Sequence, residues 1–292
     1  ITWTNRTFTI ESNTIDYYSF SMDKNQNSSP YYEITNGKIY IKSINYVSYN
    51  STSTSYFNMQ GNNFIMSLNS SGATLKMIDF PNTITGINYH TFDNNSNIQV
   101  VNFSNSGVTT LPNSIFLGCT NLKTVIMGNR ITNMGSNMCA GNTNLQSVML
   151  SSGLTTIENS SFNGCTSLMG VKIPDSVTTI SYNAFNNCSA LYEINFGTGL
   201  TTIQNSAFNG CSSLKRLTLP DKITTINYDA FLNCTSLLSI EIPDSINFIA
   251  PNAFSGCSKL KIYVKNQTTR NKILGFNLSG ISPDNIIVGS PN

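Results

Sequence analysis

Five cysteines recur at a constant interval of 23 residues, and this spacing constrains the fold more than any other feature of the chain. They are Cys165, Cys188, Cys211, Cys234 and Cys257. A fixed period of this length is the signature of a solenoid, in which each small unit stacks on its neighbours and cannot bury its apolar residues alone. We therefore predict a stack of repeated units in place of one globular core.

The residues around the cysteines repeat with the same period. Apolar side chains fill eight slots of the repeat, which in one unit are Leu168, Val171, Ile173, Val177, Ile180, Ala184, Phe185 and Cys188. The next three units fill the same slots, and the pattern extends back to Leu75 with one inserted residue near 104–107. We expect the phenylalanine of each unit, such as Phe208, to be buried between those of its neighbours.

The spacing within a unit predicts its local structure. Val171 and Ile173 alternate with Gly170 and Lys172, which is typical of a half-buried strand, and a proline follows directly. Residues 177–180 predict a second short extended piece, and residues 184–188 a tight turn or short helical piece that fills the interior. The predicted fold is mainly β, with short turns and helical pieces, in a solenoid of about nine 23-residue repeats.

These repeats resemble the BspA-type leucine-rich repeat. The resemblance rests on phrases such as Ile-Pro-Asp-Ser-Val-Thr-Thr-Ile (173–180), Ala-Phe (184–185) and Phe-Asn-Gly-Cys-Ser-Ser-Leu (208–214). It implies a leucine-rich repeat solenoid over residues 71–264. It also implies a secreted or cell-surface protein of gut or oral bacteria, or of mucosal protozoa, that binds host proteins or neighbouring cells. The family has no shared catalytic motif.

The segments on either side of the repeats are expected to close the ends of the stack. Residues 1–70 are non-repetitive and predict strands at 7–10 and 38–44, with degenerate coils near 57–68. They form either a β-rich N-terminal cap or a small β domain with its own ligand. Residues 265–292 predict a C-terminal cap: a helix over 267–274 that starts at Thr268 or Thr269 and stops at Gly275, and a last strand over 286–288, after a strand at 261–264.

The repeated cysteines are interpreted as free, buried, structural thiols. In-register side chains point in parallel, the total of seven cysteines is odd, and Asn95 and Asn142 fill the same slot, which indicates a small side chain that hydrogen-bonds a turn. A disulfide or a metal site is the alternative, although the chain has one histidine, His90, and lacks a Cys-x-x-Cys pair. We expect neither a metal nor a cofactor, and no enzymatic activity.

The composition limits the classes of molecule that the protein is expected to bind. Charged residues make up 10% of the chain and the net charge is +2, which argues against nucleic acid, because phosphate binding needs clustered Lys and Arg. A surface rich in Asn, Ser and Thr suits protein, with glycan as the alternative. The sequence contains no run of 18 apolar residues, so it predicts no membrane span. The chain starts at Ile1, which suggests a secreted or surface protein whose signal peptide has been removed.

The strand residues that face away from the interior are the candidate partner-binding face, because an exposed sheet is the usual binding surface of a solenoid. Six of them combine apolar and charged character, and the residues next to two of these, Tyr192 and Lys215, add an aromatic ring and a further charge. The candidate residues are Ile126, Met149, Lys172, Tyr192, Glu193, Lys215, Arg216 and Glu241. The alternative is that these side chains only solvate the rod. Two functions stay open: an adhesin-like recognition module, which we expect to be a monomer, and a structural spacer or self-assembling scaffold.

Overall fold

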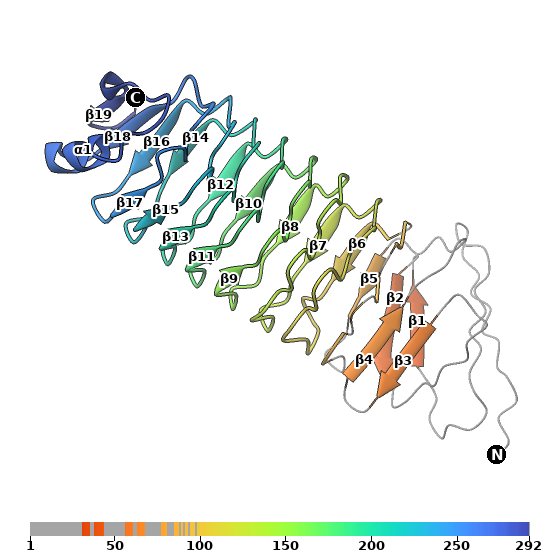
Figure 1. Ribbon diagram of the computed structural model, residues 1–292. Coiled ribbons are helices and arrows are strands. Elements are labelled where there is room, and N and C mark those ends of the chain that lie inside the picture. Colours follow the sequence, from red (N-terminus) through yellow and green to blue (C-terminus); the bar gives the residue numbers. More distant parts are fainter. Residues whose placement is uncertain are drawn as a thin grey trace, which may run out of the picture.

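The computed structural model is a rod of stacked coils with the strands β1 (Tyr31–Thr35) and β2 (Lys38–Ser43) toward one end and the C-terminal helix at the other (Figure 1). It describes the backbone of four N-terminal strands, over 31–35, 38–43, 56–60 and 63–67. It then describes residues 77–80, 85–87, 89, 91–92, 94–96 and 98–291. The predicted strand at 7–10 and His90 lie outside the described residues.

One side of the rod carries a row of parallel strands, one from each coil. The strands are β5 (Met77–Asp79), β6 (Val100–Asn102), β7 (Thr124–Ile126), β8 (Ser147–Met149), β10 (Gly170–Lys172), β12 (Glu193–Asn195), β14 (Arg216–Thr218), β16 (Ser239–Ile242) and β18 (Lys261–Val264). They form two sheets that meet between β12 and β14. Equivalent residues pair in register, as Val171 does with Ile194. The strand predicted before Pro174 is confirmed. The central residue of each three-residue strand from β6 to β14 is buried, which leaves its two flanking residues on the outer surface.

A further parallel sheet runs along another side of the rod. It contains β9 (Thr156–Ile157), β11 (Thr179–Ile180), β13 (Thr202–Ile203), β15 (Thr225–Ile226) and β17 (Phe248–Ile249). These are the second extended pieces that the sequence predicts. Their isoleucines are buried, whereas the preceding residue is threonine in four of the five strands. Threonines one position earlier donate from Oγ1 to a backbone carbonyl of the previous coil, as Thr201 does to Thr178 over 3.0 Å.

Phenylalanines form the centre of the interior. The rings of Phe162, Phe185, Phe208, Phe231 and Phe254 stack with centroid distances of 5.1, 5.2, 5.3 and 5.5 Å. All five are fully buried or nearly so, which confirms the predicted burial of Phe208 between like rings. Cys139 takes the phenylalanine slot in an earlier coil, where the buried Met138 replaces the small residue that precedes Phe185. The large and small side chains of that coil have exchanged slots.

The seven cysteines are buried thiols outside any disulfide, as predicted. Each repeated thiol donates to the carbonyl of a phenylalanine-slot residue in the preceding coil: Cys188 to Phe162 over 3.0 Å, and Cys211 to Phe185 over 3.1 Å. Burial raises the pKa of the Cys165 thiol to about 12, so the neutral, hydrogen-bonded form persists. Residues 184–188 form turns with no helix, and the turns use positive φ angles, for example 57° at Asn187.

The N-terminal strands form two antiparallel hairpins. β1 pairs with β2, and β2 pairs in parallel with β5, so this hairpin extends the main sheet. β3 (Tyr56–Gln60) pairs antiparallel with β4 (Asn63–Ser67). The predicted degenerate coils near 57–68 are therefore wrong. The Gly-Asn dipeptide between β3 and β4 is a hairpin signal that outweighs the apolar spacing used to predict coils.

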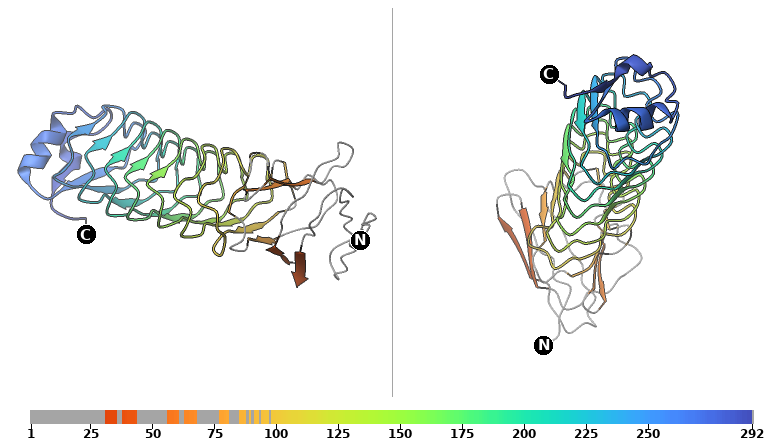
Figure 2. Two further views of the ribbon diagram at one scale, coloured as in Figure 1. Left: turned by 90° about the horizontal axis from the view of Figure 1, so that it is seen from below. Right: turned by 90° about the vertical axis from the view of Figure 1, so that its left-hand side faces the viewer.

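The C-terminal elements close the other end of the stack (Figure 2). The helix α1 (Gln267–Leu274) has the predicted bounds and ends at Gly275. Its N-cap is Asn266, whose side chain accepts a hydrogen bond from the Thr269 amide over 2.9 Å, so the prediction of Thr268 or Thr269 as the start is wrong. A 3-10 turn, η1 (Pro283–Asn285), leads into β19 (Ile286–Val288), which pairs in parallel with β18. No described helix is long and apolar enough to cross a membrane.

Candidate functional site

The structure places the eight candidate residues on one side of the rod. Six of them are exposed, with Met149 61% and Tyr192 53% accessible, whereas Ile126 and Glu241 are half-buried. The outward orientation that the strand pattern predicts is therefore correct for these residues. Their distribution along the rod is uneven, because Ile126, Met149 and Lys172 lie on β7, β8 and β10, toward the N-terminal half of the sheet.

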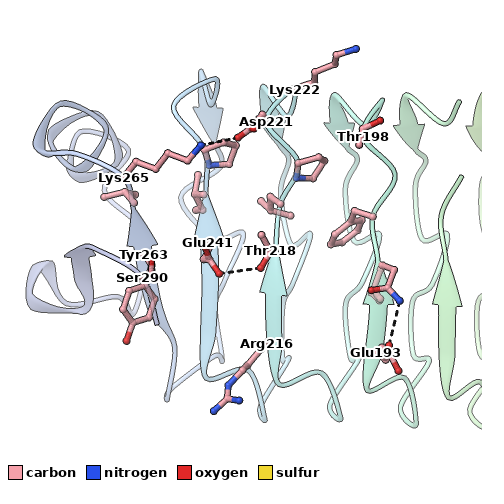
Figure 3. A pocket seen from close by; sticks show the side chains of 18 of the residues that line it. Glu193, Thr198, Arg216, Thr218, Asp221, Lys222, Glu241, Tyr263, Lys265 and Ser290 are labelled. Atoms are coloured by element: carbon pink, nitrogen blue, oxygen red, sulfur yellow. Dashed lines mark hydrogen bonds and ion pairs between the residues drawn. The ribbon is translucent and has the colours of Figure 1, made fainter. Parts of the chain in front are cut away.

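A groove lies over the C-terminal strands of the sheet and brings four of the eight residues together. Its volume is about 1050 Å³, and it extends from β12 across β14 and β16 to β18 (Figure 3). Tyr192, Glu193, Arg216 and Glu241 line it. Ile126, Met149, Lys172 and Lys215 do not. Sequence reasoning did not predict the other lining residues, which include Phe196, Tyr263 and the tail residues Gly289 and Ser290.

The floor of the groove combines hydrogen-bonded carboxylates with a guanidinium that has no side-chain partner. Thr218 donates from Oγ1 to a Glu241 carboxylate oxygen over 3.1 Å, and Asn195 donates from Nδ2 to Glu193 over 3.3 Å (Figure 3). The Arg216 guanidinium has no side-chain partner within the described part of the chain and extends toward the start of its strand. The Glu241 carboxylate is thus positioned by the neighbouring coil and the Glu193 carboxylate by its own strand, and one guanidinium stays free to donate to a ligand.

The sheet is interrupted beneath the groove. Over the described residues, no ladder joins β12 to β14, although β13 and β15 still pair on the other sheet. Phe196, which follows β12, stands where the adjacent coils have Ile173 and Leu219; it is half-buried and meets Phe208 edge-on at 6.0 Å. The interruption therefore lies where the groove floor carries its largest apolar side chain.

The rim at the carboxyl ends of the strands is held by turns. Asp221 and Lys265 form an ion pair of 3.1 Å whose side chains are highly exposed, so it contributes little to stability. Asp175 accepts from the Thr198 amide over 2.8 Å and from its hydroxyl over 3.2 Å. These two hydrogen bonds, the backbone one first, lower the pKa of the Asp175 carboxyl. Thr198 lines the groove, so this link fixes part of its wall.

The described residues differ from those of a metal centre. No cluster of three or more His, Cys, Asp or Glu residues suited to a metal ion occurs among the described residues. The cysteines are buried in the interior, and burial raises the pKa of the Cys188 thiol well above its usual value. The groove itself brings aromatic, cationic and carboxylate groups together.

Comparison with known proteins identifies the repeats. A family model described as "BspA type Leucine rich repeat region" matches in six copies over residues 42–148 and 136–261, which is more than half of the chain. The chain belongs to the BspA-type leucine-rich repeat family. This confirms the resemblance seen in the repeats, and the matching model is not that of an enzyme family. The match starts before the predicted domain boundary at residue 71, which stays a prediction.

Solved structures with a similar fold are bacterial leucine-rich repeat proteins. One from Bacteroides ovatus has 20% sequence identity and a TM-score of 0.53, covering 85% of this chain and 71% of its own. A leucine-rich cell surface protein from Faecalibacterium prausnitzii has 19% identity and a TM-score of 0.43, covering 93% and 99%. The pneumococcal vaccine antigen PcpA has 15% identity and a TM-score of 0.39, covering 99% and 100%. No curated protein sequence matches the chain significantly.

Proposed function

We propose that this protein is a secreted or cell-surface binding module that recognises an extracellular host or microbial protein through the groove over β12, β14, β16 and β18. The observation that carries the proposal is the combination in one groove of Tyr192 and Tyr263 with the unpaired Arg216. Tyrosine and arginine are enriched where protein interfaces derive most of their binding energy, because both offer a large contact area together with hydrogen-bond donors.

The groove is also large enough and shaped for a macromolecular contact. It crosses four strands, so at about 4.8 Å between strands its floor extends roughly 14 Å along the rod. Its carboxylates are already oriented by Asn195 and Thr218, which lowers the cost of ordering them on binding. A spacer that only holds other domains apart has no need of such an arrangement.

Site-specific photo-crosslinking tests the proposal. A benzophenone amino acid replaces Tyr192 in one variant and Tyr182 in a matched control, because Tyr182 is similarly exposed, at 49%, but lies in the turn after β11, outside the groove. The variants are exposed to mucosal extracellular proteins and to bacterial surface proteins. We expect a discrete crosslinked partner from the Tyr192 position and none from the Tyr182 position.

Equal crosslinking from both positions, or none from either, would contradict recognition through the groove. The second result would favour the scaffold function, which end-to-end association of the purified protein in sedimentation would then support. Circular dichroism of both variants shows whether the solenoid has formed, so a misfolded protein is not mistaken for a negative result.

A further inference from the structure

Four cations without partners gather at the N-terminal ends of β14 and β18, at the edge of the groove. They are Lys215, Arg216, Lys259 and Lys261, which we call the basic strip. All four side chains are exposed, and none forms an ion pair or side-chain hydrogen bond within the part of the chain that the structure describes. We propose that the partner of this protein contributes an acidic, extended segment that binds along the basic strip. This inference rests on the proposed function and names the chemistry of the partner.

Backbone pairing places Lys215, Arg216 and Lys261 in one row. Arg216 pairs with Ser239, and Ser239 pairs with Lys261, so the two cations are separated by one intervening strand. The Leu238 amide donates to the Lys215 carbonyl over 2.8 Å, and the Lys261 amide donates to the Leu238 carbonyl over 2.9 Å. At about 4.8 Å per strand, two clusters of positive charge therefore lie roughly 10 Å apart.

Apolar side chains alternate with these charges along the row. Leu238 is 42% exposed between the two cationic clusters, and the exposed Tyr192 and Met169 continue the row beyond β14. The phosphate groups of a nucleic acid and the sulfate groups of a glycan offer leucine and methionine side chains no apolar contact. A protein segment can meet both kinds of site, because it carries carboxylates and apolar side chains on one backbone. The row therefore favours a peptide over nucleic acid or a sulfated glycan.

The spacing of the row favours one backbone conformation. A polyproline II segment rises about 3.1 Å per residue with three residues per turn, so residues three apart share a face and lie roughly 9.3 Å apart. This matches the separation of the two cationic clusters. Carboxylates at positions i and i+3 would then face the Lys215 and Lys261 clusters, with an apolar residue over Leu238. Aromatic side chains such as Tyr192 line surfaces that bind segments of this conformation.

Fluorescence anisotropy with defined peptides tests the inference. The acidic probe is a labelled peptide of four Glu-Leu-Pro repeats, and its neutral counterpart has Gln in place of each Glu. The full chain is compared with the double variant Lys215→Glu, Lys261→Glu. The control is Lys123→Glu, an exposed lysine that takes the position of Lys215 in the coil of β7, far from the groove. Circular dichroism confirms that each variant is folded.

We expect the unchanged chain to bind the acidic probe at least about tenfold more tightly than the neutral probe, because paired charges across an interface are lost with Gln. The double variant should lose about the same factor and the control should lose less than about twofold. The inference would be overturned if the double variant bound the acidic probe as tightly as the unchanged chain does. So would heparin or a single-stranded oligonucleotide that displaces the probe completely while Leu238→Ser has no effect on peptide affinity, because the site would then be a general polyanion surface.

The two proposals fail differently. A partner that crosslinks at Tyr192 and binds the double variant as well as the unchanged chain would leave the groove as the recognition site and reject an acidic partner segment. Binding of the acidic probe to the basic strip, with no partner crosslinked at Tyr192, would reject the groove and keep the strip.

Discussion

The interior and the outer sheet surface of the same coils follow opposite rules. Inside, the phenylalanine slot holds the same ring from Phe162 to Phe254, and the cysteine below it makes the same hydrogen bond in each coil. Outside, the first residue of the strand is Gly170, Glu193 or Arg216 in consecutive coils. Stacking at a fixed spacing demands like shapes in contact, whereas an outward side chain meets only solvent or a partner. Chemistry specific to one position can therefore arise only on the outer surface.

Removing a ring from the interior should have the largest effect. Phe208→Ala leaves a cavity between two stacked rings, so we expect it to lower the free energy of unfolding by about 3 to 5 kcal/mol. Urea denaturation followed by circular dichroism measures this. Arg216→Glu, in the next repeat and on the outer surface, should change it by less than about 0.5 kcal/mol. Similar losses for the two variants would mean that the interior and the surface do not differ as described.

A glycine near the groove should also be sensitive. A Cβ at Gly197 would lie 2.1 Å from the backbone oxygen of Pro174, so Gly197→Ala should destabilise the protein by about 3 kcal/mol, at the upper end of overpacking effects. Gly170→Ala is the control, because its Cβ would meet only atoms at ordinary contact distance, the nearest at 3.7 Å. Thermal unfolding should give a clearly lower melting temperature for Gly197→Ala than for Gly170→Ala. A lower melting temperature for Gly170→Ala than for Gly197→Ala would contradict the close approach of these coils.

The coil with Cys139 in the phenylalanine slot allows a test of whether Met138 compensates for the missing ring. Cys139→Phe adds a ring where Met138 already supplies the volume, so it should cost about 1 to 2 kcal/mol by overpacking. The double variant Met138→Ala, Cys139→Phe restores the order of small and large side chains found at 184–185, and should recover most of that loss. Denaturation curves of the single and the double variant measure the free energy of unfolding of each. Additive losses in the double variant would show that the exchange of slots is not compensatory.

Acid should weaken one surface contact. The pKa of Asp175 is lowered by hydrogen bonds from Thr198, so its stabilising contribution is present above the ordinary carboxyl pKa of about 3.9 and is lost as the pH falls through the lower folded value. Asp175→Asn should remove this small part of the acid sensitivity while leaving the rest. Melting temperatures of both proteins between pH 2 and pH 7 test it, and identical pH profiles would contradict the assignment.

Periodicity predicts what the interior determines. The repeat spacing and the local sequence predict the stacked phenylalanines, the buried thiols, the strand before Pro174 and the bounds of α1. Each of these depends on residues that are close in sequence or repeated at a fixed interval. It failed for the hairpin β3–β4, where a turn signal outweighs weak apolar spacing, and for the N-cap, where Asn266 competes with two nearby threonines.

The groove depends on features that no single repeat contains. It forms where the sheet is interrupted after β12 and where Gly289 and Ser290 return beside β18. Repeat arithmetic could identify Tyr192, Glu193, Arg216 and Glu241 as outward residues, but it could not separate them from Ile126, Met149 and Lys172, which lie outside the groove. The pairing of Arg216 with Lys261 through β16 likewise follows from the shortened last repeat, which shifts the register by one residue.

Amide hydrogen exchange of the whole chain, with and without the crosslinked partner, tests recognition by the outer sheet surface most directly. We expect slower exchange on binding in residues 192–198 and 216–222, most of which line the groove. We expect no change in 201–204 and 224–227, which form the other sheet of the same coils. Slower exchange in the second set alone, or equal slowing in both, would contradict recognition by the outer sheet surface.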